Sequence, residues 1–134
     1  MAARHLRHGA AGEAMARAFL TCQGFEVIET NWRSRFGELD IICRDGPDVV
    51  FVEVKTRRET DRGLPGEALT GVKQKRLVRA ASRYLTKNSL WDRPCRFDLV
   101  AVYLHKDSCV IEHQAHVFDL SEALGGGYAY WQPW

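Results

Sequence analysis

The stretch from Gly37 to Thr56, GELDIICRDGPDVVFVEVKT, decides how this chain folds. Two runs rich in branched apolar residues, GELDIICR and VVFVEVKT, are separated by the cluster DGPD at positions 45–48. Branched apolar side chains favour strands, whereas Asp, Gly and Pro favour tight turns. The stretch therefore predicts a β-hairpin with its turn at 45–48.

The turn also sets which residues of the two strands face each other. If it is centred within DGPD, a two-residue loop and a four-residue loop give the same pairing. Asp40 then lies opposite Glu53, and Glu38 lies opposite Lys55. Because side chains alternate along a strand, these four project from one face of the hairpin. The other face, which we expect to enter a core, carries Leu39, Ile41, Val52 and Val54.

Two acids that face each other are unfavourable in a bare sheet, because like charges at opposed positions repel. The same arrangement suits a hard divalent cation, since Mg²⁺ and Mn²⁺ prefer carboxylate, water and phosphate oxygens. We therefore expect Asp40 and Glu53 to be metal ligands in a site that hydrolyses phosphodiesters. Lys55 would orient or help deprotonate the attacking water, or neutralise the pentacovalent phosphate. The alternative is a surface ladder in which Glu38 pairs with Lys55 and the other two acids are solvated.

The charge of the chain is unevenly distributed. The formal net charge is only +2, yet residues 54–96 hold 12 basic and 4 acidic side chains. A basic segment favours a polyanionic partner, most simply nucleic acid, and a solvated helix face is the alternative. The expected phosphate contacts are Arg57 and Arg58, which directly follow the second hairpin strand, and Lys73 and Arg76 on the next helix.

Outside the hairpin, the apolar pattern predicts two helices and three further strands. A strand, a crossing helix and another strand imply a right-handed parallel crossover, and hairpins precede it. The order α-β-β-β-α-β-β therefore predicts an α/β fold in which helices flank a mixed β-sheet. The expected elements are a helix ending before Gly24, strands over 25–33, 37–44 and 49–56, a helix over Glu67–Lys87, and strands over 96–104 and 109–118.

The N-terminal helix carries a further candidate residue, Glu13. Apolar residues recur at helical spacing along one face of this helix, and Glu13 lies nearly opposite them, which predicts an exposed side chain. Gly9 and Gly12 either allow another part of the backbone to approach closely or mark a frayed start. The expected buried face consists of Ala11, Ala14, Met15, Ala18, Phe19 and Cys22.

Length and composition indicate one domain. With 134 residues and a hydrophobic fraction of 46%, the chain can bury a core, which excludes a disordered tail or a disulfide-stapled miniprotein. The apolar runs are too short for a membrane helix and the N-terminus does not resemble a secretion signal, so we expect a cytoplasmic protein without membrane contact. Four cysteines lack the spacing of a zinc or redox motif and are expected to be reduced and buried: Cys22, Cys43, Cys95 and Cys109.

Aromatic residues and histidines offer further candidate contacts. Trp32 and Phe36 flank two arginines and suit either stacking of unpaired bases or packing at the edge of a core. His113 and His116 differ in strand parity, so we expect no shared histidine metal site. The domain is expected to cover residues 1–120. The glycine-hinged tail of 121–134, which ends in YAYWQPW, is expected to dock on the domain or on a second subunit.

GELDII followed by VFVEVKTR resembles the core of PD-(D/E)xK nucleases. Together with GAAGEAMARAFL, GFEVIETNWRSRFGELDII, GLPGEALTGVKQKRL and RFDLVAV, it makes nearly the whole chain similar to the small bacterial YraN-like proteins. These are similar to archaeal Holliday-junction resolvases and are regarded as predicted endonucleases. The resemblance implies a restriction-endonuclease-like fold, with Asp40 and Glu53 as metal ligands, Lys55 as the catalytic lysine and Glu13 as an accessory acid. The aromatic tail departs from the family pattern.

The sequence therefore predicts a Mg²⁺- or Mn²⁺-dependent endonuclease that hydrolyses DNA, with branched DNA as a candidate substrate. A homodimer would suit a four-way junction, because such a junction has two-fold symmetry. Two alternatives stay open. One is a nucleic-acid-binding module that does not cut, and the other is a protein-interaction module that uses the aromatic tail.

Overall fold

The computed structural model describes residues 2–58 and 70–118. Their secondary structure follows the predicted order α-β-β-β-α-β-β. No helix in these two ranges is long and apolar enough to cross a membrane. The aromatic tail lies outside the described residues, as does most of the segment between the strand expected over 49–56 and the helix expected over Glu67–Lys87. The elements are α1 (Ala2–Cys22), β1 (Glu26–Ser34), β2 (Gly37–Asp45), β3 (Asp48–Arg58), α2 (Gly71–Lys87), β4 (Cys95–Leu104) and β5 (Cys109–Gln114).

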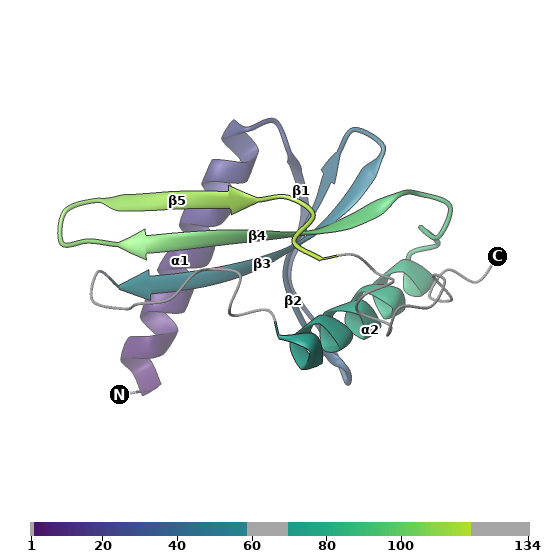
Figure 1. The fold of residues 1–134 in the computed structure, drawn as a ribbon, viewed down its shortest axis with the longest axis horizontal. Helices are drawn as coiled ribbons and strands as arrows, with labels where there is room; N and C mark the ends of the chain where they lie inside the picture. The colour runs from purple at the N-terminus through teal and green to yellow at the C-terminus, as the bar shows by residue number, and fades with distance from the viewer. Residues whose placement is uncertain (1, 59–69, 119–134) are drawn as a thin grey trace.

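The strands form one mixed sheet in the order β1-β2-β3-β4-β5. β3 and β4 are parallel, whereas all other neighbours in the sheet are antiparallel. α1 packs on one face of the sheet and α2 on the other (Figure 1). The predicted α/β class, with helices flanking a mixed sheet, is therefore confirmed, and the arrangement is compatible with a nuclease-like core.

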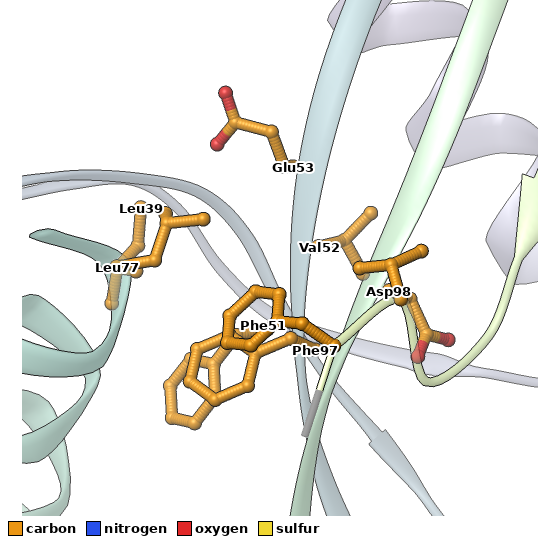
Figure 2. Close-up of a pocket in the computed structure, with 9 residues that line it drawn as sticks. Leu39, Phe51, Val52, Glu53, Leu77, Phe97 and Asp98 are labelled. Carbon is orange, nitrogen blue, oxygen red and sulfur yellow. The ribbon is translucent and has the colours of Figure 1, made fainter. Parts of the chain in front are cut away.

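Each face of the sheet buries its own apolar layer. Under α2, the rings of Phe51 and Phe97 stack with centroids 5.4 Å apart, and Tyr84 meets Phe51 edge-on at 6.0 Å. Figure 2 shows Leu39 beside these rings and Glu53 at the edge of the layer, with its carboxylate directed away from them. Glu53 thus stands where the apolar layer ends. The layer under α1 contains Ala16, Leu20, Ile41, Cys43, Val50, Val52, Val100 and Val102.

The predicted hairpin register is confirmed from the turn to Ile41, which pairs with Val52. Beyond this pair, β2 separates from β3 and remains paired only with β1. Asn31 of β1 has φ 52°, in the left-handed region, and the β1–β2 hairpin bends at this level. Because of the bend, the prediction that Leu39 shares a face with Ile41 is wrong: Leu39 packs under α2 and Ile41 under α1.

The buried face of α1 differs from the predicted one. Leu20 and Ala16 are fully buried against the sheet. Gly12 is buried as well, and a Cβ added to it would overlap the side chain of Thr56 on β3. Close approach of the backbone is therefore the reason for this glycine. Of the residues expected to be buried, Met15 and Phe19 pack against the core, but Ala11, Ala14, Ala18 and Cys22 are exposed.

Two element ends also differ from the prediction. Thr70 has an extended backbone and its hydroxyl accepts a hydrogen bond from the Lys73 N–H, so it caps α2, which begins at Gly71 rather than at Glu67. β5 ends at Gln114 rather than at Phe118, because His116 has φ 52° and turns the chain away from the sheet. The side chains of α2 that pack against the sheet are Leu77, Ala80, Ala81, Tyr84 and Leu85, whereas Val72 is exposed.

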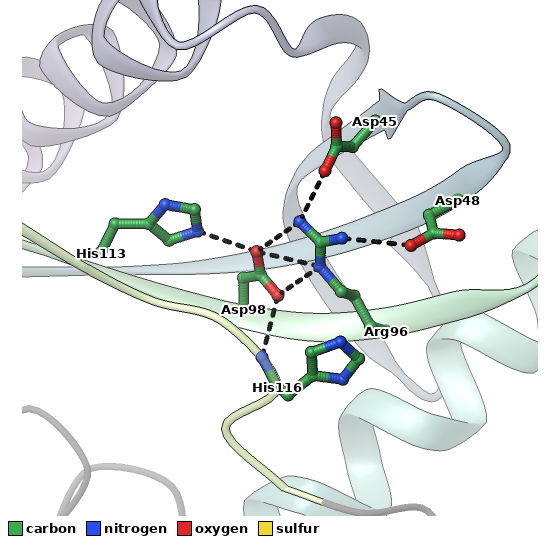
Figure 3. Close-up of polar contacts among 6 residues, drawn as sticks. All are labelled: Asp45, Asp48, Arg96, Asp98, His113 and His116. Carbon is green, nitrogen blue, oxygen red and sulfur yellow. Dashed lines mark hydrogen bonds and ion pairs between the residues drawn. The ribbon is translucent and has the colours of Figure 1, made fainter.

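A buried charged network fixes the sheet near the β2–β3 turn (Figure 3). Asp98, whose side chain is fully buried, accepts a hydrogen bond from Arg96 Nε at 3.1 Å and contacts His113 Nε2 at 2.8 Å. It also accepts from the backbone N–H of His116, beyond the end of β5. The two Nη atoms of Arg96 donate to Asp45 and Asp48, each at 3.1 Å. The network thus ties the β2–β3 turn to β4 and to the C-terminal end of β5.

Candidate functional site

Asp40 and Glu53 lie where β2 separates from β3. They stand directly beyond the last paired residues, Ile41 and Val52. The Val54 N–H donates a hydrogen bond to Asp40 Oδ2 at 2.8 Å, so the carboxylate satisfies a β3 donor at the point where strand pairing stops. The structure therefore brings together the two acids that the hairpin register predicted to be neighbours. Asp40 reaches β3 through its side chain instead of through the strand ladder.

Burial and charge both act on Asp40. Burial raises its pKa to about 7, and the negative charge of Glu53 contributes to the rise. Glu13 and Glu38 also raise this pKa, whereas the hydrogen bond from Val54 lowers it. A carboxyl group with a pKa near neutrality is only partly ionised at pH 7. A cation bound beside this carboxyl group would lower its pKa and favour the ionised form.

Glu53 is paired with Lys55 on the same face of β3. Lys55 Nζ lies 3.4 Å from Glu53 Oε1, and the two side chains are only 21% and 18% exposed. Burial raises the pKa of Glu53, and the positive charge of Lys55 lowers it. The alternative of a Glu38–Lys55 ladder is not what the structure has, because the Glu38 carboxylate lies 3.7 Å from Arg33 Nε on the exposed hairpin.

A cavity of about 190 Å³ opens between this acid–lysine pair and α2. Two of the predicted phosphate contacts, Lys73 and Arg76, line it from the helix. The positive charge of Lys55 lowers the pKa of Lys73, because the two ammonium groups are neighbours. An anion that enters this cavity would therefore meet three cationic side chains beside the carboxylate of Glu53. The other lining residues are Gly37, Glu38 and Leu77.

The two arginines expected to follow the second hairpin strand are still part of β3. Arg57 pairs with Tyr103 and Arg58 with Leu104, both on β4. Neighbouring residues of a strand point to opposite faces, so only Arg57 shares the face of Lys55. The charge of Arg57 contributes to the lowered pKa of Lys73, which places it near the cavity. Arg57 thus belongs with the predicted phosphate contacts of this face, whereas Arg58 lies on the other side.

Glu13 approaches the acid pair from α1. The prediction of a solvent-exposed side chain is wrong, because Glu13 is half-buried beside the face of α1 that packs on the sheet. Burial raises its pKa, a hydrogen bond with the Asn31 side chain lowers it, and the charge of Glu38 raises it. Glu13 and Asn31 also line a groove of about 600 Å³ between α1 and β1. Its position is compatible with the accessory role that the resemblance implies.

The donor chemistry of the site fits a hard divalent cation. Within residues 2–58 and 70–118, no group of three or more His, Cys, Asp or Glu side chains forms a metal centre from protein ligands alone. Mg²⁺ commonly uses only one or two carboxylates, and waters and phosphate oxygens complete its shell. Asp40 and Glu53 supply such oxygen donors, and each of them has a raised pKa that a nearby cation would lower. The pair thus suits Mg²⁺ or Mn²⁺ bound together with a phosphate-containing substrate.

Two residues that shape this site were not singled out from the sequence. Asn31 allows the bend of the hairpin and hydrogen-bonds Glu13. Asparagine is enriched at positive φ, so an Asn within a predicted strand was an available signal. Thr56 sets how closely α1 approaches β3, but only the packing of the helix reveals that contact.

The fold and the site define an α/β protein in which a central hairpin carries an acid pair and a lysine against a basic helix. The chain belongs to the family described as "Uncharacterised protein family UPF0102", which matches residues 12–102. The resemblance to the YraN-like family is thereby confirmed. The match includes Glu13, Asp40, Glu53 and Lys55, whereas the aromatic tail lies outside it.

Bacterial relatives share most of the chain. A UPF0102 protein of Nitratidesulfovibrio vulgaris is 49% identical over 132 residues, which cover 98% of each chain. A UPF0102 protein of Symbiobacterium thermophilum is 53% identical over 96 residues, or 72% of this chain and 81% of the relative. A third, from Lawsonia intracellularis, is 36% identical over 126 residues, or 94% of this chain and 96% of the relative.

Proposed function

We propose that this protein is a metal-dependent endonuclease that hydrolyses DNA phosphodiesters, with Mg²⁺ or Mn²⁺ held by Asp40 and Glu53. The observation that carries the proposal is the partly buried acid pair at the separation of β2 from β3, with Lys55 3.4 Å from Glu53. Like charges that are partly buried together are unfavourable for folding, and a cation and a phosphate would explain such a pair beside a basic cavity.

The residues of the chain have distinct roles in this proposal. A bound Mg²⁺ or Mn²⁺ would polarise the phosphodiester and lower the pKa of a bound water. Lys55 holds a positive charge at the cavity and stabilises the negative charge that develops on phosphorus-bound oxygens. In hydrolysis, the water oxygen bonds to phosphorus, one phosphorus–oxygen bond to a sugar breaks, and the leaving oxygen takes a proton. Glu13, close to the pair on the α1 side, is proposed as an accessory acid in this step.

The proposed contacts to the rest of the substrate are electrostatic. Arg57, Lys73 and Arg76 surround the cavity and suit phosphate oxygens on either side of the scissile bond. Such contacts fix the register of the backbone without reading base sequence. They support nucleic acid as the partner, and we propose DNA, including branched DNA, because of the similarity to junction resolvases.

Cleavage of a labelled DNA panel tests the proposal. Linear, flapped and four-way-junction DNA are incubated with Mg²⁺ or Mn²⁺ and either wild type, Asp40→Asn or Asp107→Asn. Asp107 is an exposed acid outside the site, so its variant controls for the loss of one negative charge. We expect metal-dependent cutting by wild type and Asp107→Asn only. Equal cutting by Asp40→Asn would remove the site assignment, and cutting of one DNA form alone would identify the substrate.

A second candidate function is favoured by the ion pair between Lys55 and Glu53. Lys55 already neutralises one of the two carboxylates, so the site carries less uncompensated negative charge when no metal is bound. A nucleic-acid-binding module that does not cut would use the same basic cavity. Tight, salt-sensitive binding that EDTA does not change, with no cutting of any DNA form, would favour this function over the endonuclease. For either function we propose a homodimer, which sedimentation with and without junction DNA tests.

A further inference from the structure

A second groove, of about 480 Å³, lies between the β1–β2 hairpin and the C-terminal half of α2. Two cations, Arg33 and Arg35, line it from the hairpin, and two more, Arg83 and Lys87, line it from the helix. Among the residues that the structure describes, no acidic side chain lines this groove. The remaining lining residues are Trp32, Ser34 and Thr86.

The bend in the hairpin creates this groove. Because Trp32 turns toward α2, its ring packs edge-on against Tyr84 with centroids 5.4 Å apart. The turn of the hairpin lies beside the helix (Figure 1), and a Cβ added to Gly37 would lie 4.0 Å from the Arg76 carbonyl oxygen. These contacts bring the hairpin arginines opposite the last two cations of α2. A straight hairpin would not build the second wall.

The positive charge of the groove is poorly neutralised. Arg33 is 78% exposed and its ion pair with Glu38, at 3.7 Å, is long and solvent-exposed. The Arg35 guanidinium lies over the Phe36 ring, 5.3 Å from its centroid, and not beside a carboxylate in the described parts of the chain. Gathering four like charges from two elements opposes folding, so the arrangement favours an anionic ligand.

The groove continues the basic cavity of the candidate site along one helix. Lys73 and Arg76 line the cavity, while Arg83 and Lys87 line the groove, so cations extend along α2 from residue 73 to residue 87. At 1.5 Å of rise per residue, this distance is about 21 Å. One DNA strand covers it in about six nucleotides at 3.4 Å per step. An extended polyanion fits such a track better than a small anion does.

We propose that this groove binds the phosphate backbone of the same nucleic acid that enters the acid–lysine site, about six nucleotides from the scissile phosphate. The inference rests on the proposed function, because it takes the substrate to be nucleic acid. It adds a second contact region, formed by Arg33 and Arg35 of the hairpin with Arg83 and Lys87 of α2. Backbone contacts there would hold the substrate without reading sequence.

A matched pair of double variants tests the groove. Arg83→Gln/Lys87→Gln removes two groove cations, and Lys75→Gln/Arg79→Gln removes two exposed cations of the same helix that line neither cavity. Both variants change the net charge equally. Binding of fluorescein-labelled duplex and junction DNA is followed by anisotropy in EDTA, so that cutting does not interfere, over a series of salt concentrations. Thermal unfolding establishes that each variant is folded.

Log affinity falls as log salt rises, and we expect the fall to be less steep for the groove variant, by about 1.8 in slope. This is about 0.9 for each phosphate that the variant no longer neutralises. If the variant and the wild type bind DNA equally at about 1 M salt, the variant binds roughly 60-fold more weakly at 0.1 M. The Lys75/Arg79 variant should change affinity much less. Arg33→Gln/Arg35→Gln, which alters the other wall, should weaken binding in the same way and replaces the helix variant if that one fails to fold.

The other outcomes overturn the inference in distinguishable ways. Equal losses of affinity in both helix variants would mean that these cations act only through net charge, which overturns the groove and leaves the endonuclease proposal intact. If polyglutamate of matched charge displaces DNA as well as unlabelled DNA does, the groove recognises acidic chains in general, which overturns its assignment to nucleic acid. No salt-dependent DNA binding by wild type would overturn the groove and the proposed function together.

Discussion

Replacing Asp40 with asparagine should stabilise the metal-free protein at neutral and alkaline pH. Asparagine keeps an oxygen that accepts the Val54 N–H, but it removes a carboxyl group whose pKa is raised from 3.8 to about 7, mainly by burial and then by the charge of Glu53. A group with a higher pKa in the folded protein than in the unfolded chain binds its proton more tightly when folded. The free energy of unfolding of the wild type therefore falls as the pH rises through this range.

The size of the effect follows from the two pKa values of Asp40. Each pH unit between them corresponds to about 1.4 kcal/mol, so the rise from 3.8 to about 7 corresponds to about 4 kcal/mol. This stability is fully present below the unfolded value and is lost as the pH passes through the folded value. The variant has no such group. The two proteins should have similar free energies of unfolding near pH 4, and at about pH 8 the variant should be more stable by about 4 kcal/mol.

Urea unfolding in EDTA, followed by tryptophan fluorescence across this pH range, measures the difference. Asp107→Asn serves as the control, because this exposed acid should give no pH-dependent gain. Adding Mg²⁺ should then stabilise the wild type at about pH 8 and not the variant, since a ligand stabilises only the state that binds it. If Asp40→Asn changes stability by the same amount at every pH, the carboxyl group is not held in the environment described and the reasoning fails.

Three further predictions concern single contacts. Gly12→Ala should lower the free energy of unfolding by about 1–3 kcal/mol in chemical denaturation, although alanine has the better helix propensity, because the new Cβ overlaps Thr56. Adding Thr56→Ala should restore most of this loss. Arg96→Met should lower the free energy of unfolding by about 3–5 kcal/mol in the same measurement, because it leaves the fully buried Asp98 carboxylate without its main partner. A loss under about 1 kcal/mol would contradict this prediction. Lys55→Met should abolish cleavage of DNA. It should also tighten Mn²⁺ binding in calorimetry, because the lysine no longer competes with the metal for the Glu53 carboxylate. Weaker Mn²⁺ binding would oppose the role assigned to Lys55.

The hairpin could be predicted because its information is local. A turn cluster at 45–48 and two alternating apolar runs fix a register, since a slip of one residue would exchange the buried and exposed faces. The pairing from Ile41–Val52 to Asp45–Asp48 follows this register. The bend at Asn31 could not be derived in the same way, because a left-handed residue within a strand is held by tertiary contacts, here Trp32 on Tyr84 and the bond from Asn31 to Glu13.

The face of α1 shows why an alanine-rich helix is hard to orient from its sequence. Alanines bury little apolar area, so the difference between its possible faces is small. The contact that decides the orientation is a missing side chain, at Gly12, where the helix meets Thr56. The predicted buried face of α1 was therefore partly wrong, and the predicted exposure of Glu13 was wrong for the same reason. A residue expected in solvent instead lies half-buried near Asp40.

The bend of the β1–β2 hairpin explains why both proposed contact regions occur in one place. Where β2 leaves β3, the Val54 N–H loses a strand partner, and the Asp40 carboxylate replaces it at 2.8 Å. The sheet thereby needs a side-chain oxygen acceptor at the position where a carboxylate can also serve a cation. The same departure turns Trp32 onto α2 and brings the hairpin arginines to the helix. A change that straightened the hairpin should therefore disrupt the arrangement of both the acid pair and the basic groove. This coupling is expected although no residue of the groove touches Asp40 through a described hydrogen bond or ion pair.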